Sequence, residues 1–164
     1  MRLLIIRHAA AVPGGTPGIA DDDRPLTPKG KARFRAAAKG LARLTPRPDV
    51  LLTSPLPRAR QTAEIAAQAF KRLEPRLAPA LASGRVEDIM AALAKEPRDV
   101  TVAVVGHEPT LGALVARLVG AAGGGPFAFK KGGAALVDLP DGPLAGGRLV
   151  WFVRPRMLRD LAAR

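Results

Sequence analysis

Residues 3–10 read LLIIRHAA, an uninterrupted aliphatic run that ends directly on an arginine and a histidine. Such a run, without a polar residue at every second position, is typical of a strand buried on both faces of a parallel sheet. A later stretch, DVTVAVVGH at 99–107, has the same character and also ends on a histidine. The chain has only 2 histidines, so both fall just past the carboxyl end of a predicted strand.

Strand patterns alternate with helical patterns along the rest of the chain. Strands are expected at 2–7, 49–54, 99–107, 132–139 and 147–153. Helices are expected at 28–44, where Thr27 is the N-cap, and at 57–70, 86–96, 108–120 and 154–164. The remaining segments are a long loop at 9–26, an ambiguous stretch at 72–84 in which 76–78 is the candidate for a short strand, and a glycine loop at 123–125. This alternation predicts an α/β fold with a largely parallel sheet.

The composition is that of an ordinary folded protein. A length of 164 residues, 48% hydrophobic and 24% charged, predicts a single domain over 1–164. The absence of cysteine excludes disulfides, thiolate catalysis and cysteine-based metal sites, and it favours a cytoplasmic location. The early apolar run, Leu3 to Ile6, is too short for a signal peptide or a membrane span, so no membrane partner is expected.

The charge balance points to anionic partners. The chain has 26 lysines and arginines against 14 acidic residues, which gives a net charge of +12. The positive electrostatic potential of such a protein attracts phosphate-bearing or acidic molecules. Nucleic acid is a less favoured partner, because the basic residues are scattered and no aromatic residues are interleaved with them for stacking on bases.

Four side chains are expected at one edge of the sheet. Arg7 and His8 follow the first strand, His107 follows the strand at 99–107, and Arg58 opens the helix after the strand at 49–54. In open α/β sheets, ligands bind outside the carboxyl ends of the strands. Arginine presents a planar fork that fits phosphate oxygens, and the amides at a helix start add further donors. The sequence therefore predicts a pocket for a phosphoryl group.

This pocket suggests covalent catalysis. A neutral His8 is expected to attack phosphorus and form a phosphohistidine, which water then hydrolyses. The arginines and a protonated His107 would stabilise the phosphoryl oxygens, so neither a metal nor a cofactor is expected. Taken singly, a histidine at a strand end is more often a hydrogen-bonded structural residue, and a lone arginine more often makes a surface ion pair. The joint placement of all four favours the catalytic interpretation.

Four short stretches of the sequence, in this order along the chain, resemble a known family. LLIIRHAA, LTPKG, TSPLPRARQTAE and VVGHEPTLG make the chain resemble the histidine phosphatase superfamily, the phosphoglycerate mutase-like group (branch 1). The short length and the stretch DDDRPLT make it most similar to the SixA-type phosphohistidine phosphatases. The resemblance implies a three-layer αβα sandwich with His8 as the phosphorylated nucleophile and a phosphate pocket formed by Arg7, Arg58 and His107. It also directs Arg24 toward this pocket, although a salt bridge to the acidic residues at 21–23 is an alternative use.

Two features depart from the family pattern. The glycine that usually follows the histidine is Ala9, whose methyl group would crowd the backbone near the phosphate. No residue clearly matches the acid that protonates the leaving oxygen in larger members: Glu87 and Asp88 fit the first turn of a helix, and Glu108 is a substrate-site candidate with a rival capping role. The nitrogen of a phosphohistidine takes a proton from solvent more easily than an alkoxide does. Phosphohistidine in a protein is therefore the favoured substrate.

Other interpretations stay open at this level. The general acid, the oligomeric state and the physiological substrate are not determined by the sequence. A phosphomonoesterase or mutase acting on a small phosphorylated metabolite would use the same pocket, and so would a phosphate-binding module that has lost catalysis. Lys130 is a candidate for steering an acidic substrate protein, against the alternative that Lys130 and Lys131 are solvated loop charges.

Overall fold

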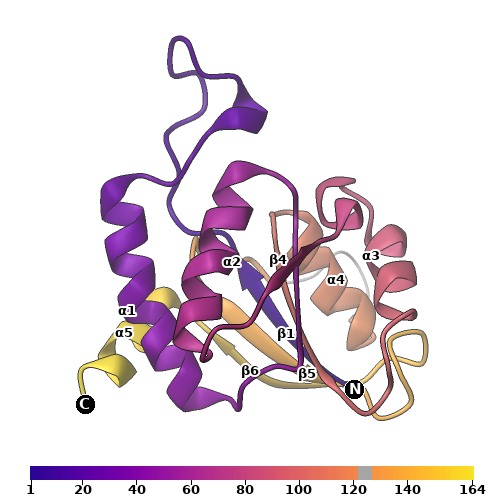
Figure 1. Ribbon diagram of the computed structural model, residues 1–164. Helices are drawn as coiled ribbons and strands as arrows, with labels where there is room; N and C mark the ends of the chain where they lie inside the picture. The colour runs from indigo at the N-terminus through magenta and orange to yellow at the C-terminus, as the bar shows by residue number, and fades with distance from the viewer. Residues whose placement is uncertain (122–126) are drawn as a thin grey trace.

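A six-stranded sheet forms the centre of the computed structural model, which describes residues 1–121 and 127–164 (Figure 1). The strands are β1 Arg2–Arg7, β2 Val50–Thr53, β3 Pro75–Leu77, β4 Thr101–Gly106, β5 Ala134–Asp138 and β6 Arg148–Val153. Their order across the sheet is β3-β2-β4-β1-β5-β6. β5 pairs antiparallel with β1 and β6, and the other pairings are parallel. The prediction of an α/β fold with a mostly parallel sheet is confirmed.

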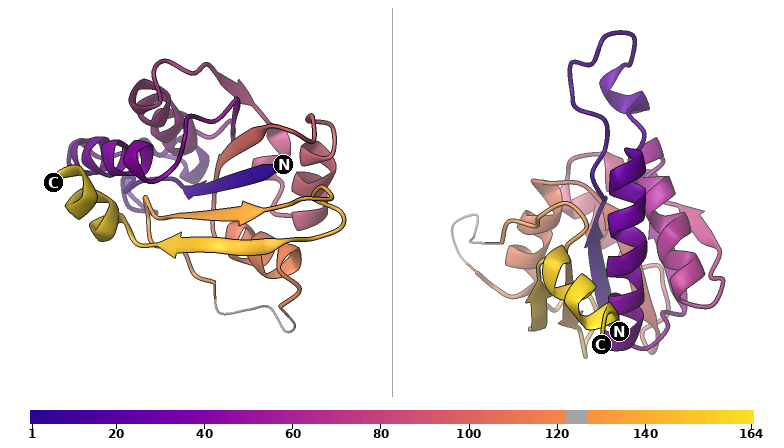
Figure 2. Two further views of the ribbon diagram at one scale, coloured as in Figure 1. Left: turned by 90° about the horizontal axis from the view of Figure 1, so that it is seen from below. Right: turned by 90° about the vertical axis from the view of Figure 1, so that its left-hand side faces the viewer.

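Helices cover both faces of this sheet and complete three layers (Figure 2). The described α-helices are α1 Pro28–Leu44, α2 Pro57–Ala69, α3 Val86–Leu93, α4 Thr110–Leu118 and α5 Pro155–Ala162. Buried residues of α1, α2 and α5 form a core cluster with one face of the sheet. Buried residues of α3 and α4 form a second cluster with the opposite face. The expected αβα sandwich is therefore present.

The central strand β1 contributes to both layers. Leu4 and Ile6 belong to the cluster under α1, α2 and α5, whereas Leu3 and Ile5 belong to the cluster under α3 and α4. All four side chains are fully buried. Each such burial stabilises the fold by about 1.5–3 kcal/mol. Because both faces are covered, the strand has no position for a polar residue, which explains its continuous aliphatic sequence.

The register of β1 against β4 places the two histidines next to each other. Arg7 pairs with Gly106 at the carboxyl end of the two parallel strands. The backbone N–H of His8 continues the ladder and donates to the carbonyl of Gly106 over 3.0 Å. The chain therefore leaves the sheet at His8 and at His107 on neighbouring strands and at the same edge.

Helix α1 holds the segment that follows His8. Thr27 caps the helix by accepting a hydrogen bond from the N–H of Gly30 over 2.9 Å, as its sequence position predicts. The backbone N–H of Thr27 donates to the carbonyl of Ala10 over 3.0 Å. A Cβ at Gly30 would collide with that same carbonyl oxygen. A glycine is needed at this position so that α1 can pack directly on the backbone next to the nucleophile candidate.

Most element bounds agree with the sequence prediction, and the differences have local causes. The helix expected at 108–120 begins two residues later, because the residue before Pro109 is disfavoured in helical geometry. The helix expected at 86–96 ends at Leu93, and the expected strand at 76–78 is β3, at Pro75–Leu77. Short 3-10 helices occupy Asp21–Asp23 in the long loop and Pro79–Ala82. The glycine loop expected at 123–125 lies outside the described residues.

Within the described part of the chain, no helix has both the length and the apolar character that crossing a membrane requires.

Candidate functional site

The four side chains expected at the sheet edge are neighbours in the structure. The imidazole rings of His8 and His107 have centroids 5.1 Å apart, with planes inclined by 53°. Arg7 is the last residue of β1, and Arg58 lies in the first turn of α2, directly after β2. The charges of both arginines act on both imidazoles. The carboxyl ends of β1, β2 and β4 therefore bring these groups together.

His8 is held with one ring nitrogen available for chemistry. Its side chain is only 5% exposed, and Nδ1 lies 2.8 Å from the carbonyl oxygen of Ala9. Because a carbonyl can only accept a hydrogen bond, Nδ1 carries the proton and Nε2 keeps its lone pair. The pKa of His8 is lowered to about 3, and burial is the largest cause. The charges of Arg58 and Arg7, and of His107 when it is protonated, act in the same direction, whereas the hydrogen bond to Ala9 opposes the shift. At neutral pH the ring of His8 is therefore uncharged, as a nucleophile would have to be.

His107 is fixed by a serine that follows β2. Its Nε2 lies 2.7 Å from Oγ of Ser54, a fully buried side chain. The pKa of His107 is lowered to about 4 by burial and by the charges of Arg58, Arg7 and Arg24, and the charge of Asp22 opposes the shift. In the protein without a bound anion His107 is therefore neutral. The protonated His107 was expected for a site that holds a phosphoryl group, and it stays a prediction for that state. A buried imidazole beside two arginines stays neutral until a negative charge enters the site.

Arg7 and Glu108 hold the same backbone segment from two sides. Arg7 donates to the carbonyl of Phe129, and the N–H of Phe129 donates to the carboxylate of Glu108 over 3.3 Å. Burial lowers the pKa of Arg7, and the charge of Glu108 opposes this. Burial raises the pKa of Glu108. Hydrogen bonds from the backbone of Phe129 and Gly112 and the charge of Arg7 lower it in part. Glu108 thus anchors the segment before β5 to the start of α4, beside the predicted pocket.

Arg58 is oriented by the long loop. Arg58 is 6% exposed, and its guanidinium donates to the carbonyl of Asp21 over 2.9 Å and lies 3.9 Å from the carboxylate of the same residue. Arg24 forms a closer ion pair with Asp21, at 2.9 Å, and also donates to the carbonyl of Val12. The ion pair with Asp21, the alternative use of Arg24, is therefore present, and the charge of Arg24, in addition to burial, lowers the pKa of Arg58 and of His107. Binding of substrate by Arg24 stays a prediction.

Thr62 connects Arg58 to the backbone of the nucleophile candidate. Its hydroxyl donates to the carbonyl of Arg58 over 2.7 Å and accepts from the N–H of Ala9 over 3.0 Å. Thr62 is fully buried on α2. The methyl group of Ala9 is accommodated among the buried residues under α1 and α2, with Phe34 and Ala37 in the same cluster. The additional methyl is thus absorbed by the core layer.

Three buried side-chain nitrogens of the site have no hydrogen-bond partner. Among the described residues, the buried side-chain nitrogen and oxygen atoms in this condition are Nε of Arg7, Nε of Arg58 and Nδ1 of His107. Unpaired buried donors are costly, and such groups in a folded protein are commonly satisfied by a ligand or by water. Two guanidinium donors and one imidazole nitrogen form a set that suits an oxyanion. A phosphoryl group in this place would supply the missing acceptors.

The remaining candidates lie farther from this set or have other contacts. Lys130 is exposed. Glu87 and Asp88 lie in the first turn of α3, as the alternative interpretation predicts, and Asp88 pairs with Arg85 at 3.8 Å. Across residues 1–121 and 127–164, no group of three or more histidine, cysteine or acidic side chains is arranged to hold a metal ion.

Sequence reasoning missed the residues that position the catalytic candidates. Ser54 and Thr62 lie inside TSPLPRARQTAE, the block that supplied Arg58, but no role was predicted for either. Asp21 was expected only as a partner of Arg24, whereas its carbonyl also binds Arg58. A polar residue directly after a buried strand, as Ser54 is after β2, is the signal that would have identified one of them.

Comparison with known proteins gives a family and a fold. The sequence model of the histidine phosphatase superfamily (branch 1) matches residues 3–83, a span that includes His8 and Arg58. An uncharacterised protein of Picosynechococcus sp. is 36% identical over 136 residues, which are 81% of this chain and 82% of that protein.

Solved structures agree with this family. The protein histidine phosphatase SixA, solved in complex with tungstate, is 30% identical and superimposes with a TM-score of 0.82 over 96% of this chain and 99% of its own. The α-ribazole phosphatase from Shigella flexneri is 22% identical, with a TM-score of 0.75 over 94% of this chain and 97% of its own, and it shares the fold.

Proposed function

We propose that this chain, which belongs to the histidine phosphatase superfamily (branch 1), hydrolyses phosphohistidine in a protein through a covalent phosphohistidine on His8. The observation that carries the proposal is the set of buried nitrogens without a hydrogen-bond partner on Arg7, Arg58 and His107, three residues close enough to His8 for their charges to lower its pKa. These are the donors that a phosphoryl group needs, next to the nucleophile that can accept it.

In the first step, Nε2 of His8 attacks phosphorus and forms a new N–P bond while the bond from phosphorus to the leaving group breaks. Nδ1 keeps its proton, because it donates to the carbonyl of Ala9 throughout. Arg7, Arg58 and His107 stabilise the charge on the three equatorial oxygens, which is the main requirement of phosphoryl transfer. The side chains of the site thus supply both the nucleophile and the positive charge.

In the second step, water attacks phosphorus and the N–P bond to His8 breaks. Inorganic phosphate leaves, and the ring returns to its neutral form with the lone pair on Nε2. The dianion in the site raises the proton affinity of His107, whose pKa is lowered without it by burial and by the arginines. His107 is then able to donate a hydrogen bond from Nδ1 to a phosphoryl oxygen, because Nε2 faces Ser54.

The leaving group argues for phosphohistidine as the substrate. A phosphohistidine that is protonated on its second ring nitrogen leaves as neutral imidazole, so the enzyme need not provide an acid. The likeness to SixA, a protein histidine phosphatase, supports the same choice. A small phosphorylated metabolite is the second candidate, and it is favoured by one observation: the carboxyl of Glu108, with a pKa raised by burial, contacts the segment bound by Arg7.

A substrate comparison tests these alternatives. Release of phosphate is measured from a phosphohistidine peptide, from sugar phosphates and from nucleotides, with the wild type and with Glu108→Gln. The proposal expects the highest kcat/KM for the phosphohistidine peptide and little loss of it in Glu108→Gln. Preference for an alkyl phosphate ester, together with a large loss of kcat in Glu108→Gln, would overturn it in favour of a metabolite phosphatase.

A further inference from the structure

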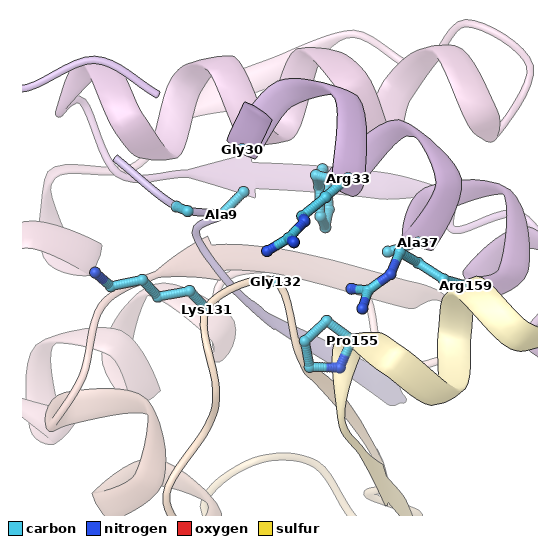
Figure 3. A pocket seen from close by; sticks show the side chains of 10 residues that line it. Ala9, Gly30, Arg33, Ala37, Lys131, Gly132, Pro155 and Arg159 are labelled. Carbon is cyan, nitrogen blue, oxygen red and sulfur yellow. The ribbon is translucent and has the colours of Figure 1, made fainter. Parts of the chain in front are cut away.

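A basic hollow lies directly beside the proposed phosphate site. It has a volume of about 270 Å³ and is bordered by the first half of α1, the start of α5 and the turn before β5 (Figure 3). Its cationic side chains are Arg33, Lys131 and Arg159. In Figure 3 the guanidinium groups of Arg33 and Arg159 point into the space between α1 and α5, whereas the side chain of Lys131, which also lines the hollow, extends away from both of them.

The wall of the hollow is the backbone that carries the nucleophile. Ala9 and Gly132 both line it. The N–H of Gly132 donates to the carbonyls of Arg7 and His8, over 3.2 Å and 3.1 Å. A molecule that presents a phosphoryl group to His8 therefore has its adjoining surface next to this hollow.

The three cations of the hollow lack acidic partners within it. No aspartate or glutamate lines the hollow, and the salt bridges between described residues are made by other arginines. Asp160 follows Arg159 on α5, but successive residues of a helix point to different sides. The charges of Arg33, Lys131 and Arg159 thus remain available to an external anion.

The rest of the lining is apolar, with Phe34, Ala37 and Pro155 among its residues. The ring of Phe34 is 2% exposed and belongs to the core, so it offers no face for stacking on a base. The volume of the hollow suits one or two amino-acid side chains. A carboxylate on a short aliphatic stem matches both the cations at the rim and the apolar floor.

We infer that this hollow receives acidic side chains of the substrate protein that lie close in space to its phosphohistidine. The inference rests on the proposed function and adds a determinant of specificity to it. Carboxylates placed between Arg33 and Arg159 would orient the substrate surface over Ala9 and hold the phosphoryl group against Nε2 of His8. Substrates with neutral neighbours would reach the same nucleophile without this contact.

A pair of phosphohistidine peptides tests the inference. One peptide carries glutamates on either side of the phosphohistidine, and the other carries glutamines at the same positions. At low salt, the wild type is expected to hydrolyse the glutamate peptide with a kcat/KM about tenfold higher, mainly through KM, and added salt should reduce this preference.

Charge-reversal variants locate the preference on the protein. The double variant Arg33→Glu, Arg159→Glu is expected to lose the preference for the glutamate peptide while it hydrolyses the glutamine peptide at the wild-type rate. Arg35→Glu is the matched control: Arg35 is an exposed arginine of the same helix, but it lines a different surface with Ile65 and Gln68 of α2. This control should keep the preference. The milder pair Arg33→Gln, Arg159→Gln repeats the test without adding negative charge.

The outcomes separate the inference from the proposed function. If the wild type hydrolyses both peptides equally, or if the double variant keeps the preference, the inference fails and the proposed function stands. If neither peptide is hydrolysed, the proposed function fails and the inference fails with it. Binding of a DNA or RNA oligomer that depends on Arg33 and Arg159, without any preference between the peptides, would also overturn it.

Discussion

The imidazoles of His8 and His107 lie with ring centroids 5.1 Å apart, and each ring has one nitrogen bound to a fixed partner. His8 uses Nδ1 to bind the carbonyl of Ala9, and His107 uses Nε2 to bind the hydroxyl of Ser54. Protonation of either ring would add a third positive charge to those of Arg7 and Arg58, which already act on both rings. The pair is therefore held neutral, and it is complementary to a ligand that brings negative charge.

The first prediction concerns the charge of the two rings. Because the pKa of His8 is lowered to about 3 and that of His107 to about 4, neither imidazole should titrate near the ordinary value of 6.5. Nitrogen NMR of the imidazoles measures this directly, since the chain has only 2 histidines. Addition of orthovanadate, an analogue of the phosphoryl group, should raise the pKa of His107. A titration midpoint near 6.5 for His8 in the free protein would contradict the account.

The second prediction concerns stability against pH. Each histidine has a lower pKa in the folded state than its ordinary value of 6.5, so the unfolded chain binds more protons below that pH. The stabilisation is complete above pH 6.5 and is lost as the pH falls toward the folded values. Each ring adds up to about 1.4 kcal/mol per pH unit to the slope of the unfolding free energy against pH. Urea unfolding between about pH 7 and pH 5 should show a shallower slope for His8→Asn. Equal slopes for the variant and the wild type would count against a buried neutral His8.

The third prediction concerns Ser54 as a positioning residue. Its oxygen accepts from the N–H of Leu56 over 3.2 Å, so its own proton is free to donate to Nε2 of His107. This fixes the proton of the neutral ring on Nδ1, the unpaired nitrogen. Ser54→Ala should lower kcat on the order of 10- to 100-fold.

A purely structural role for Ser54 has a different signature. The nitrogen chemical shifts of His107 report which ring nitrogen carries the proton, and they should change in Ser54→Ala while the protein stays folded. Unchanged shifts together with unchanged kcat would refute the positioning role.

The fourth prediction concerns the shape of the cation at position 58. Arg58→Lys keeps the positive charge but loses the planar guanidinium group. In the wild type one Nη of this group donates to the carbonyl of Asp21, and its Nε has no hydrogen-bond partner. The variant should lose roughly 100-fold in kcat. Asp21→Asn is the matched control, because it removes the carboxylate at 3.9 Å and keeps the carbonyl that accepts from Arg58. Steady-state kinetics should show the larger loss for Arg58→Lys, and the reverse order would disprove the assigned role of the fork.

The sheet and the positions of the two histidines could be predicted because the central strands are buried on both faces. Burial forces long aliphatic runs such as residues 3–6 and 102–105, and these runs are recognisable without any partner. Parallel pairing then brings the residues that follow β1 and β4 to one edge. Arg7 and Arg58 could be predicted for the same reason. Arg7 is the last residue of β1, and Arg58 lies in the first turn of α2, which starts at that edge after β2.

The place of Ser54 directly after β2 could have marked it as a site residue, but its contact with His107 could not be predicted, nor could the contacts of Thr62 and Asp21. Each depends on a side-chain rotamer and on the packing of a distant segment, such as Thr62 of α2 against the backbone of Ala9. The neutral state of His107 in the free protein could not be predicted either, because it depends on the combined burial and charges of groups from β1, α2 and the long loop. The hollow formed by Arg33 and Arg159 exists only because α5 packs against α1.

The most direct test is to locate the phosphoryl group on the protein during turnover. The enzyme is mixed with a phosphohistidine peptide, quenched in alkali so that phosphohistidine survives, and analysed by phosphorus NMR and by mass spectrometry of its peptides. A transient phosphoryl group is expected on Nε2 of His8, because Nδ1 is bound to Ala9, and none is expected in His8→Ala. A phosphoryl group on His107, or full turnover by His8→Ala, would contradict this expectation.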